Sequence, residues 1–232
     1  MPQSALARKI GEFATDRLGR KLSENRLIRR AKIMQATLNL IASRGYDAVT
    51  VEELAAASEV SKKTLYDIYG SKQAVVAQAV ALRLDTVTDQ IERDLPQDGL
   101  ERLRSIVRQT CAAVLDTPQL SRALAPMLVG SAQEFHLTAF FERLHRNALE
   151  TMKRERLLHS WVDIEFTARS MMFDQVSVQN LWAGMNIADG EYEDFAMLDT
   201  YRVLTPLAKV SLRKDLVEEV RLLQNRLRDR RS

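Results

Sequence analysis

The sequence is poor in residues that would cross-link the chain or anchor it in a bilayer. It contains a single cysteine, Cys111, which excludes an internal disulfide and is expected to be a buried thiol within an apolar helix. No run of residues is long and apolar enough to span a membrane, and no signal-peptide pattern opens the chain. We therefore expect a soluble, cytoplasmic protein.

Patterns that are typical of catalytic sites are also missing. We find no Ser-His-Asp arrangement, no zinc-protease motif and no glycine-rich phosphate loop. Glu142 and His145 have the Glu-x-x-His spacing of di-iron bundles, but such sites need that motif twice together with further glutamates. The other nearby pair, Glu155 with His159, has the wrong spacing. The sequence therefore predicts no enzyme, no bound metal and no cofactor.

Charge is distributed unevenly over a length that exceeds one typical domain. Residues 1–72 hold 13 Lys and Arg against 8 Asp and Glu, net +5, whereas residues 73–232 hold 21 against 23, net −2. A basic end is expected of a protein that binds nucleic acid there, although a surplus of this size is modest. We predict a basic arm at 1–25, a DNA-binding domain at 26–72 and a second domain at 73–232.

Helix signals follow one another without a convincing strand, so the predicted fold class is all-α. Apolar residues recur with helical spacing, and Pro or Gly clusters separate the runs. Capping pairs are expected at Asp98 with Glu101 and at Ser131 with Glu134. The predicted helices after residue 70 cover 71–95, 99–116, 118–130, 131–159, 163–185 and 195–229, with Pro206 either kinking the last of these or restarting it.

Residues 45–72 carry the most informative pattern, which is two short helices joined by a tight turn. Thr50 followed by Glu53 forms a capping box that predicts a helix over 51–57. Ser61 is a good N-cap for the second helix, and Gly70 marks its end. This is the layout of a helix-turn-helix DNA reader.

The second helix of the pair is predicted to present polar side chains to solvent. Ammonium groups neutralise phosphates, and Thr or Tyr hydroxyls reach phosphate oxygens or base edges. The alternative is an ordinary solvated helix, but the capped helix before it and the Gly-Ser-Lys sequence after it favour DNA binding. The outward residues are Lys62, Lys63, Thr64, Tyr66 and Asp67.

Residues 29–75 resemble the N-terminal DNA-binding domain of the TetR family of bacterial transcriptional regulators. The resemblance rests on Gly45-Tyr46, Thr50, Val60-Ser61, Leu65-Tyr66, Tyr69 and Ser71-Lys72. Lys63 stands where the family often has Gly, and Ile68 where it often has His, so no sequence preference is carried over.

The resemblance implies a dimeric repressor whose third helix enters the major groove of a palindromic operator. It places Thr50, Tyr66 and Lys72 at phosphates, while Lys62, Lys63, Thr64 and Asp67 are candidates for base reading. Asp67 alternatively orients a lysine. Ser61 and Tyr69, which belong to the same motif, complete the predicted set of DNA-binding residues.

The resemblance also implies an effector cavity in the C-terminal bundle, where an apolar or amphipathic small molecule would bind and release the DNA. Ordinary core packing is the competing interpretation of the same residues. The candidate lining residues are Met127, Phe135, Phe140, Met171, Phe173, Gln175, Gln179 and Trp182.

Three further segments have open interpretations. Residues 1–25 either bind phosphates or an adjacent minor groove, or they fray as many termini do. Tyr201, Leu204, Ala208 and Ser211 form an apolar stripe that is expected at a dimer interface. The stripe of Leu216, Val220, Leu223 and Leu227 favours packing on its own bundle over a coiled coil.

The alternative functions are non-specific binding of nucleic acid and a helical interaction protein without DNA binding. Activation instead of repression, and regulation without a ligand, also remain open.

Overall fold

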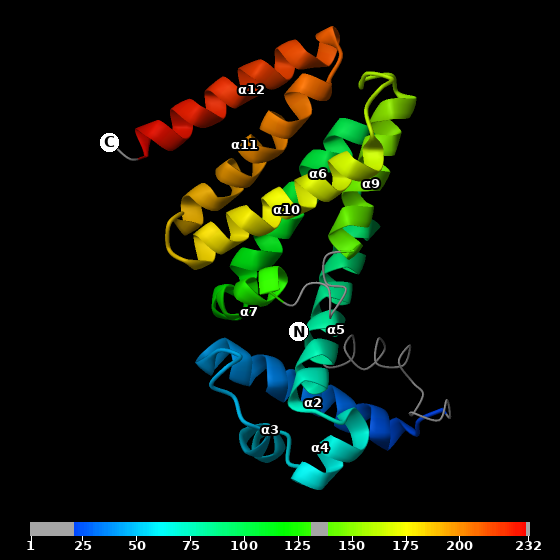
Figure 1. Ribbon diagram of the computed structural model, residues 1–232, viewed down its shortest axis with the longest axis vertical. Helices are drawn as coiled ribbons and strands as arrows, with labels where there is room; N and C mark the ends of the chain where they lie inside the picture. Colours follow the sequence, from blue (N-terminus) through cyan, green and yellow to red (C-terminus); the bar gives the residue numbers. More distant parts are fainter. Residues whose placement is uncertain (1–20, 131–138, 231–232) are drawn as a thin grey trace. The chain divides into compact units, whose positions relative to one another are not determined.

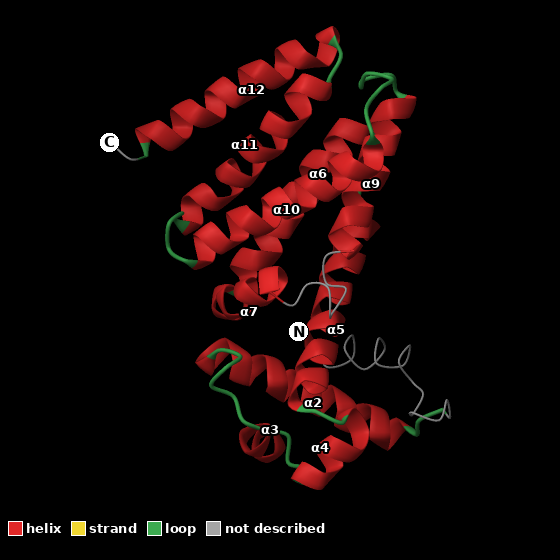
Figure 2. Cartoon of the chain, in the orientation of Figure 1, coloured by secondary structure: helices red, strands yellow, loops and turns green. Residues whose placement is uncertain are grey.

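The computed structural model describes residues 21–130 and 139–230, with only the backbone described at 128–130, 139 and 140. Within these ranges the regular structure consists of ten α-helices and two short 3-10 turns (Figures 1 and 2). The predicted all-α fold class is confirmed. The chain divides into two compact units, Met1–Asp89 and Gln90–Ser232. The dividing point lies inside helix α5 (Lys72–Arg93), because that helix continues from the first unit into the second.

The first unit is built on α2 (Glu24–Arg44), α3 (Val51–Ala57) and α4 (Lys62–Tyr69). Helix α2 packs against α3, and α3 packs against α4. The buried face of α2 consists of Ile33, Met34, Thr37, Leu38 and Ile41. Ala36 and Leu40 are half-buried at the edge of this face.

The second unit contains α6 (Gly99–Asp116), α7 (Pro118–Gly130), α9 (Ala139–Arg154) and α10 (Ile164–Ala183), followed by α11 (Tyr192–Leu204) and α12 (Val210–Asp229). Helix α10 packs against α7, α9 and α11, and α6 packs against α9 and α11 (Figure 1). Short 3-10 turns at Asp189–Glu191 and Thr205–Leu207 precede α11 and α12. The buried core of the second unit includes Leu103, Ile106, Leu149, Met152 and Trp182.

Carboxylate caps explain where two of these helices begin. The Asp98 carboxylate accepts a hydrogen bond from the Glu101 amide at 2.8 Å, although the return bond of the predicted capping box is not formed. Asp163 caps α10 by accepting from the Phe166 amide at 3.0 Å. The predicted pair Ser131 and Glu134 lies outside the described residues. Helix α9 ends at Arg154, earlier than the predicted position near His159, and Arg156 follows it with a φ of 60°.

The predicted helix over 195–229 is two helices. Helix α11 ends at Leu204, Pro206 occupies the first turn of the intervening 3-10 segment, and Lys209 is the N-cap of α12. Ala208 lies between the helices, where it forms an antiparallel bridge with Leu158. Tyr201, Leu204 and Ala208 are buried inside the unit, and α11 ends before Ser211, so these four residues do not form the predicted interface stripe.

Helix α12 packs on α11, as the spacing of its apolar residues predicts. Leu212, Leu216, Leu223 and Leu227 are buried, while Val220 is half-buried beside them. Across the residues that the structure describes, no helix is both long and apolar enough to cross a membrane, and no group of three metal-binding side chains comes together.

Candidate nucleic-acid interface

The first helix of the pair, α3, starts at the predicted capping box. The Thr50 hydroxyl accepts from the Glu53 amide at 3.3 Å, and the Glu53 carboxylate accepts from the Thr50 amide at 2.9 Å. The Thr50 amide and the Thr50 hydroxyl both donate to the Glu53 carboxylate, and these two bonds lower the pKa of Glu53 below its ordinary value. Arg44, at the end of α2, pairs with the other oxygen of the Glu53 carboxylate. One glutamate therefore fixes the start of α3 and joins it to α2.

The turn between α3 and α4 is held by its backbone. The Val60 amide donates to the Ala55 carbonyl at 3.0 Å, and Glu59 adopts a φ of 55°. Ser61 then caps α4 through the Thr64 amide at 3.1 Å, as predicted. Gly70, with a φ of 86°, ends the helix. These local bonds set the direction in which α4 leaves the turn.

Two apolar side chains anchor α4 to the unit. Leu65 is fully buried, and Tyr69 is only 8% exposed with its hydroxyl enclosed. Burial raises the pKa of Tyr69 to about 12, so the phenol stays protonated. The prediction that Tyr69 belongs to the DNA-binding surface is therefore wrong in this structure. Leu65 and Tyr69 are the buried residues of this eight-residue helix, so the Tyr69 ring supplies much of the apolar contact that holds α4 to the unit.

The opposite side of α4 is open to solvent. Lys62, Lys63 and Asp67 are exposed, Tyr66 is 48% exposed, and Thr64 is half-buried beside the Ser61 cap. Four of the five residues predicted to point outward are therefore exposed, and Thr64 lies at the edge of the accessible face. Such a face combines two ammonium groups with hydroxyls, which are donors that suit phosphate oxygens and base acceptors.

The two lysines differ in their surroundings. Lys62 forms an ion pair with Glu52 of α3, and the hydrogen bond from its ammonium group lowers the pKa of that carboxyl. No ion pair is recorded for Lys63 within the described ranges. The spacing of ten residues between Glu52 and Lys62 matches no helical repeat, so sequence inspection missed this pair. It follows that Lys63 is the more available cation.

Lys72 lies at the start of α5 and is tied to the segment before α3. Its ammonium group donates to the Tyr46 carbonyl at 2.9 Å and lies 4.6 Å from the centroid of the Tyr46 ring. One of its three donors is thus occupied, while the others remain for an external anion. The Gly45-Tyr46 and Ser71-Lys72 parts of the motif contact each other directly.

The candidate effector residues do not form one lining. Met127, Met171 and Trp182 are buried, Gln175 and Gln179 are half-buried, and Phe173 is 56% exposed on the outside of α10. Phe173 is therefore not a lining residue. Phe135 and the side chain of Phe140 lie outside what the structure describes. The Trp182 ring contacts two side chains, with the Arg122 guanidinium 4.2 Å and the Tyr192 ring 5.3 Å from its centroid.

Three buried polar atoms in the same bundle belong to one predicted lining residue, Gln175, and to two residues that the sequence did not predict as effector contacts, Thr110 and His145. Thr110 Oγ1, His145 Nε2 and Gln175 Nε2 have no hydrogen-bond partner among the described residues. The His145 ring is completely enclosed, its Nδ1 lies 2.7 Å from the Phe141 carbonyl, and burial lowers its pKa. Buried polar groups are normally paired, so these atoms mark places where a water molecule or ligand can bind.

Comparison with known proteins places this architecture in a defined class of regulators. Residues 33–79 match the model of bacterial regulatory proteins of the tetR family. The HTH-type transcriptional repressor KstR of Rhodococcus jostii is 30% identical over 96 residues, which cover 41% of this chain and 45% of that protein. An uncharacterized HTH-type regulator of Bacillus subtilis, YdeS, is 27% identical over 71% of this chain and 84% of its own length.

Solved structures extend the likeness of the fold beyond the helix-turn-helix region. A TetR transcription regulator from Haloarcula marismortui has a TM-score of 0.66 at 19% identity, covering 78% of this chain and 98% of that one. The fatty acid degradation regulator FadR from Bacillus halodurans has a TM-score of 0.63 at 17% identity, covering 74% and 94%. At these identities the comparison establishes a shared fold.

The class is therefore that of helix-turn-helix, DNA-binding transcriptional regulators with a helical C-terminal domain. Within this class, residues 33–79 match the DNA-binding domain of the TetR family, and the chain shares the fold of solved TetR regulators.

Proposed function

We propose that this protein is a homodimeric repressor that binds a palindromic operator through α4 and is released from it by a small molecule. The exposed face of α4, with Lys63 free of any recorded ion pair, is the observation that carries the proposal. Such a regulator acts in the cytoplasm on chromosomal DNA and needs no catalytic group or cofactor. Residues 26–72 form the DNA-binding domain, and residues 73–232 form the domain for ligand binding and dimerisation.

The proposed DNA contacts follow from position and chemistry. Thr50, Tyr66 and Lys72 lie at helix starts or on exposed faces and carry donors suited to phosphates. Lys63, Thr64 and Asp67 are proposed to read base edges from the first turns of α4. Lys62 joins them once phosphate displaces Glu52, and Ser61 acts by capping the helix.

Two readers require two copies of the chain. Phe166, Phe173 and Leu181 are 70%, 56% and 48% exposed and lie seven and eight positions apart on α10, so they share one side of the helix. A row of large apolar side chains supports association between copies. In a dimer the two α4 helices would enter major grooves about one helical turn apart, roughly 34–36 Å, or a near multiple of it.

Release by an effector is supported by the interior of the second unit. Thr110, His145 and Gln175 each leave a buried polar atom unpartnered, while Met127 and Met171 offer apolar surface. An amphipathic small molecule would satisfy both kinds of group. For release, its binding free energy must differ between the DNA-bound and free conformations. Repression in preference to activation is supported by the likeness to KstR, which is itself described as a repressor.

The proposal is tested by selecting bound sequences from a random DNA pool at physiological salt. A specific regulator should recover a palindrome and prefer it over random DNA by roughly 10³-fold or more. Recovery of no shared sequence by a folded protein would indicate non-specific binding or a role without DNA.

Variants of α4 then locate the reading surface. Lys63→Ala and Tyr66→Ala should each weaken operator binding by about tenfold, because each removes one contact to DNA. The control Lys214→Ala removes an exposed positive charge from α12 and should leave operator binding unchanged. Normal binding by both α4 variants would show that another surface reads the operator.

A further inference from the structure

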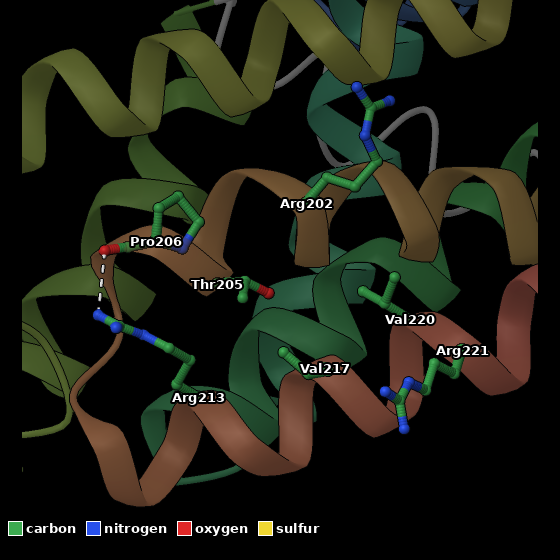
Figure 3. A pocket seen from close by; sticks show the side chains of 7 residues that line it. All are labelled: Arg202, Thr205, Pro206, Arg213, Val217, Val220 and Arg221. Atoms are coloured by element: carbon green, nitrogen blue, oxygen red, sulfur yellow. Dashed lines mark hydrogen bonds between the residues drawn. The ribbon is translucent and has the colours of Figure 1, made fainter.

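A surface groove of about 500 Å³ lies between the end of α11, the following 3-10 turn and the first half of α12 (Figure 3). Pro206, Val217 and Val220 supply its apolar surface. Val217 is 39% exposed although it is aliphatic, and Val220 lies three residues further along the same helix. The volume is within the range of small-molecule sites, roughly 300–1,000 Å³.

The charged side chains of this groove are all arginines, at positions 202, 213 and 221. Arg202 is paired with Asp199 at 3.1 Å, and Arg221 with Glu218 at 3.7 Å, each within its own helix. Both arginines are exposed, and each is compensated by a carboxylate of its own helix. The lining contains no acidic side chain, so its electrostatic character favours an anion.

Arg213 differs from the other two because no carboxylate partner is recorded for it within the described ranges. Its Nε and Nη2 donate to the Ala208 carbonyl at 3.1 and 2.9 Å, and Nη2 reaches the Pro206 carbonyl at 3.5 Å. Nη2 also lies 3.1 Å from His159 Nε2, which must be the acceptor because a guanidinium only donates. These bonds hold Arg213 at the Pro206 end of the groove, as the dashed line in Figure 3 shows for Pro206.

The lining thus combines a positioned cation at one end with aliphatic surface next to it. The Thr205 hydroxyl does not change this character, because it donates to the Tyr201 carbonyl in the last turn of α11 at 2.6 Å. A neutral apolar molecule would leave the guanidinium unused, and a small inorganic anion would leave the valines unused.

We propose that the groove formed by α11 and α12 binds an amphipathic carboxylate, with the anionic head at Arg213 and the aliphatic tail along Val217 and Val220. The terminal Nη1 of Arg213 makes no recorded hydrogen bond and is the donor for the head group. This site is separate from the effector cavity proposed inside the bundle, since its lining residues come from α11, the 3-10 turn and α12. Binding there does not depend on whether the protein binds DNA.

The test uses octanoate as the anionic probe and 1-octanol as the neutral probe of equal chain length. Both are titrated into full-length protein with labelled valine and leucine methyl groups, and the methyl signals are followed by NMR. Octanoate should shift the Val217 and Val220 signals saturably, and 1-octanol should bind at least about tenfold more weakly because it lacks the charge. Equal affinity of the two probes, or no saturable shift at these valines, overturns the proposal.

Charge variants separate a specific site from general attraction. Arg213→Gln should weaken octanoate binding by about tenfold, whereas Lys214→Gln, which removes the same charge from a neighbouring exposed residue, should not. Equal effects of the two variants contradict the proposal. Val217→Glu alters an exposed side chain and places a carboxylate in the groove, so it should abolish octanoate binding while the protein remains folded. Retained binding in that variant overturns the proposal even if Arg213→Gln fails to fold.

Discussion

Gly45 shows how one residue determines the path into the helix-turn-helix. It ends α2 with φ of 77° and ψ of 162°, a region that is accessible essentially only to glycine. A Cβ atom placed there would meet no other atom within 4 Å. The requirement for glycine at this position is therefore conformational and not steric.

Gly45→Ala should lower the free energy of unfolding by about 1–3 kcal/mol through backbone strain alone. Gly190→Ala is the matched control, because a Cβ atom there also meets nothing within 4 Å and its φ is not positive. Denaturant unfolding followed by circular dichroism measures both. Similar losses in the two variants would show that backbone conformation is not the cause.

His145 makes stability depend on pH. Burial lowers the pKa of its imidazole below the ordinary value of 6.5. Below that pH the imidazole is protonated more readily in the unfolded chain than in the folded protein. Stability is therefore complete above pH 6.5 and declines as the pH falls below it, by at most about 1.4 kcal/mol per pH unit.

Comparison with His145→Leu isolates this contribution, because every other titrating group is shared by the two proteins. Between pH 7 and about pH 5 the native protein should lose more stability than the variant. Parallel stability curves for the two proteins would refute the assignment.

At the scale of the element, the start of a helix is stabilised by hydrogen bonds between residues that are close in sequence. Asp163 caps α10, whereas Lys209, the N-cap of α12, makes no capping bond despite an extended backbone. Asp163→Ala should cost about 1 kcal/mol, and Lys209→Asp should stabilise the protein by up to about 1 kcal/mol. Opposite shifts in the denaturation midpoint are expected, and shifts of the same sign would contradict the capping argument.

The difference between short-range and long-range contacts explains which elements the sequence could predict. The predicted starts of α3 at Thr50 and α4 at Ser61 are confirmed, because both depend on hydrogen bonds spanning three residues. Tyr69 and Phe173 were misplaced because burial depends on neighbours that are distant in sequence. Helical periodicity alone leaves open whether an aromatic residue of α10 packs inside or remains exposed.

The break between α11 and α12 also depends on contacts that the sequence does not reveal. Thr205-Pro206 was recognised as either a kink or a restart, and the structure forms a restart. That outcome depends on backbone pairing with residues far away, since the His159 amide donates to the Leu207 carbonyl at 3.1 Å and the Lys209 amide to the Leu157 carbonyl at 2.8 Å. No local sequence pattern predicts backbone pairing of this kind.

At the scale of the whole molecule, the exposed apolar row on α10 is the contact that we propose between two copies of the chain. Phe173→Glu should weaken self-association by at least about tenfold, because it would bury a charge in an apolar contact. Leu222→Glu on α12 is the control, since it introduces the same charge at another exposed apolar residue on a different helix. Sedimentation equilibrium measures both, and equal weakening by the two variants would argue against α10 as the contact.

The single cysteine has a practical consequence for observing such assemblies. Burial raises the pKa of the Cys111 thiol to about 12, which leaves little thiolate to react with labelling reagents at neutral pH. A second cysteine placed at an exposed position such as Lys63 would therefore react selectively in the otherwise unaltered chain. A spin label attached there would report the distance between two reading helices in solution, with and without a bound molecule.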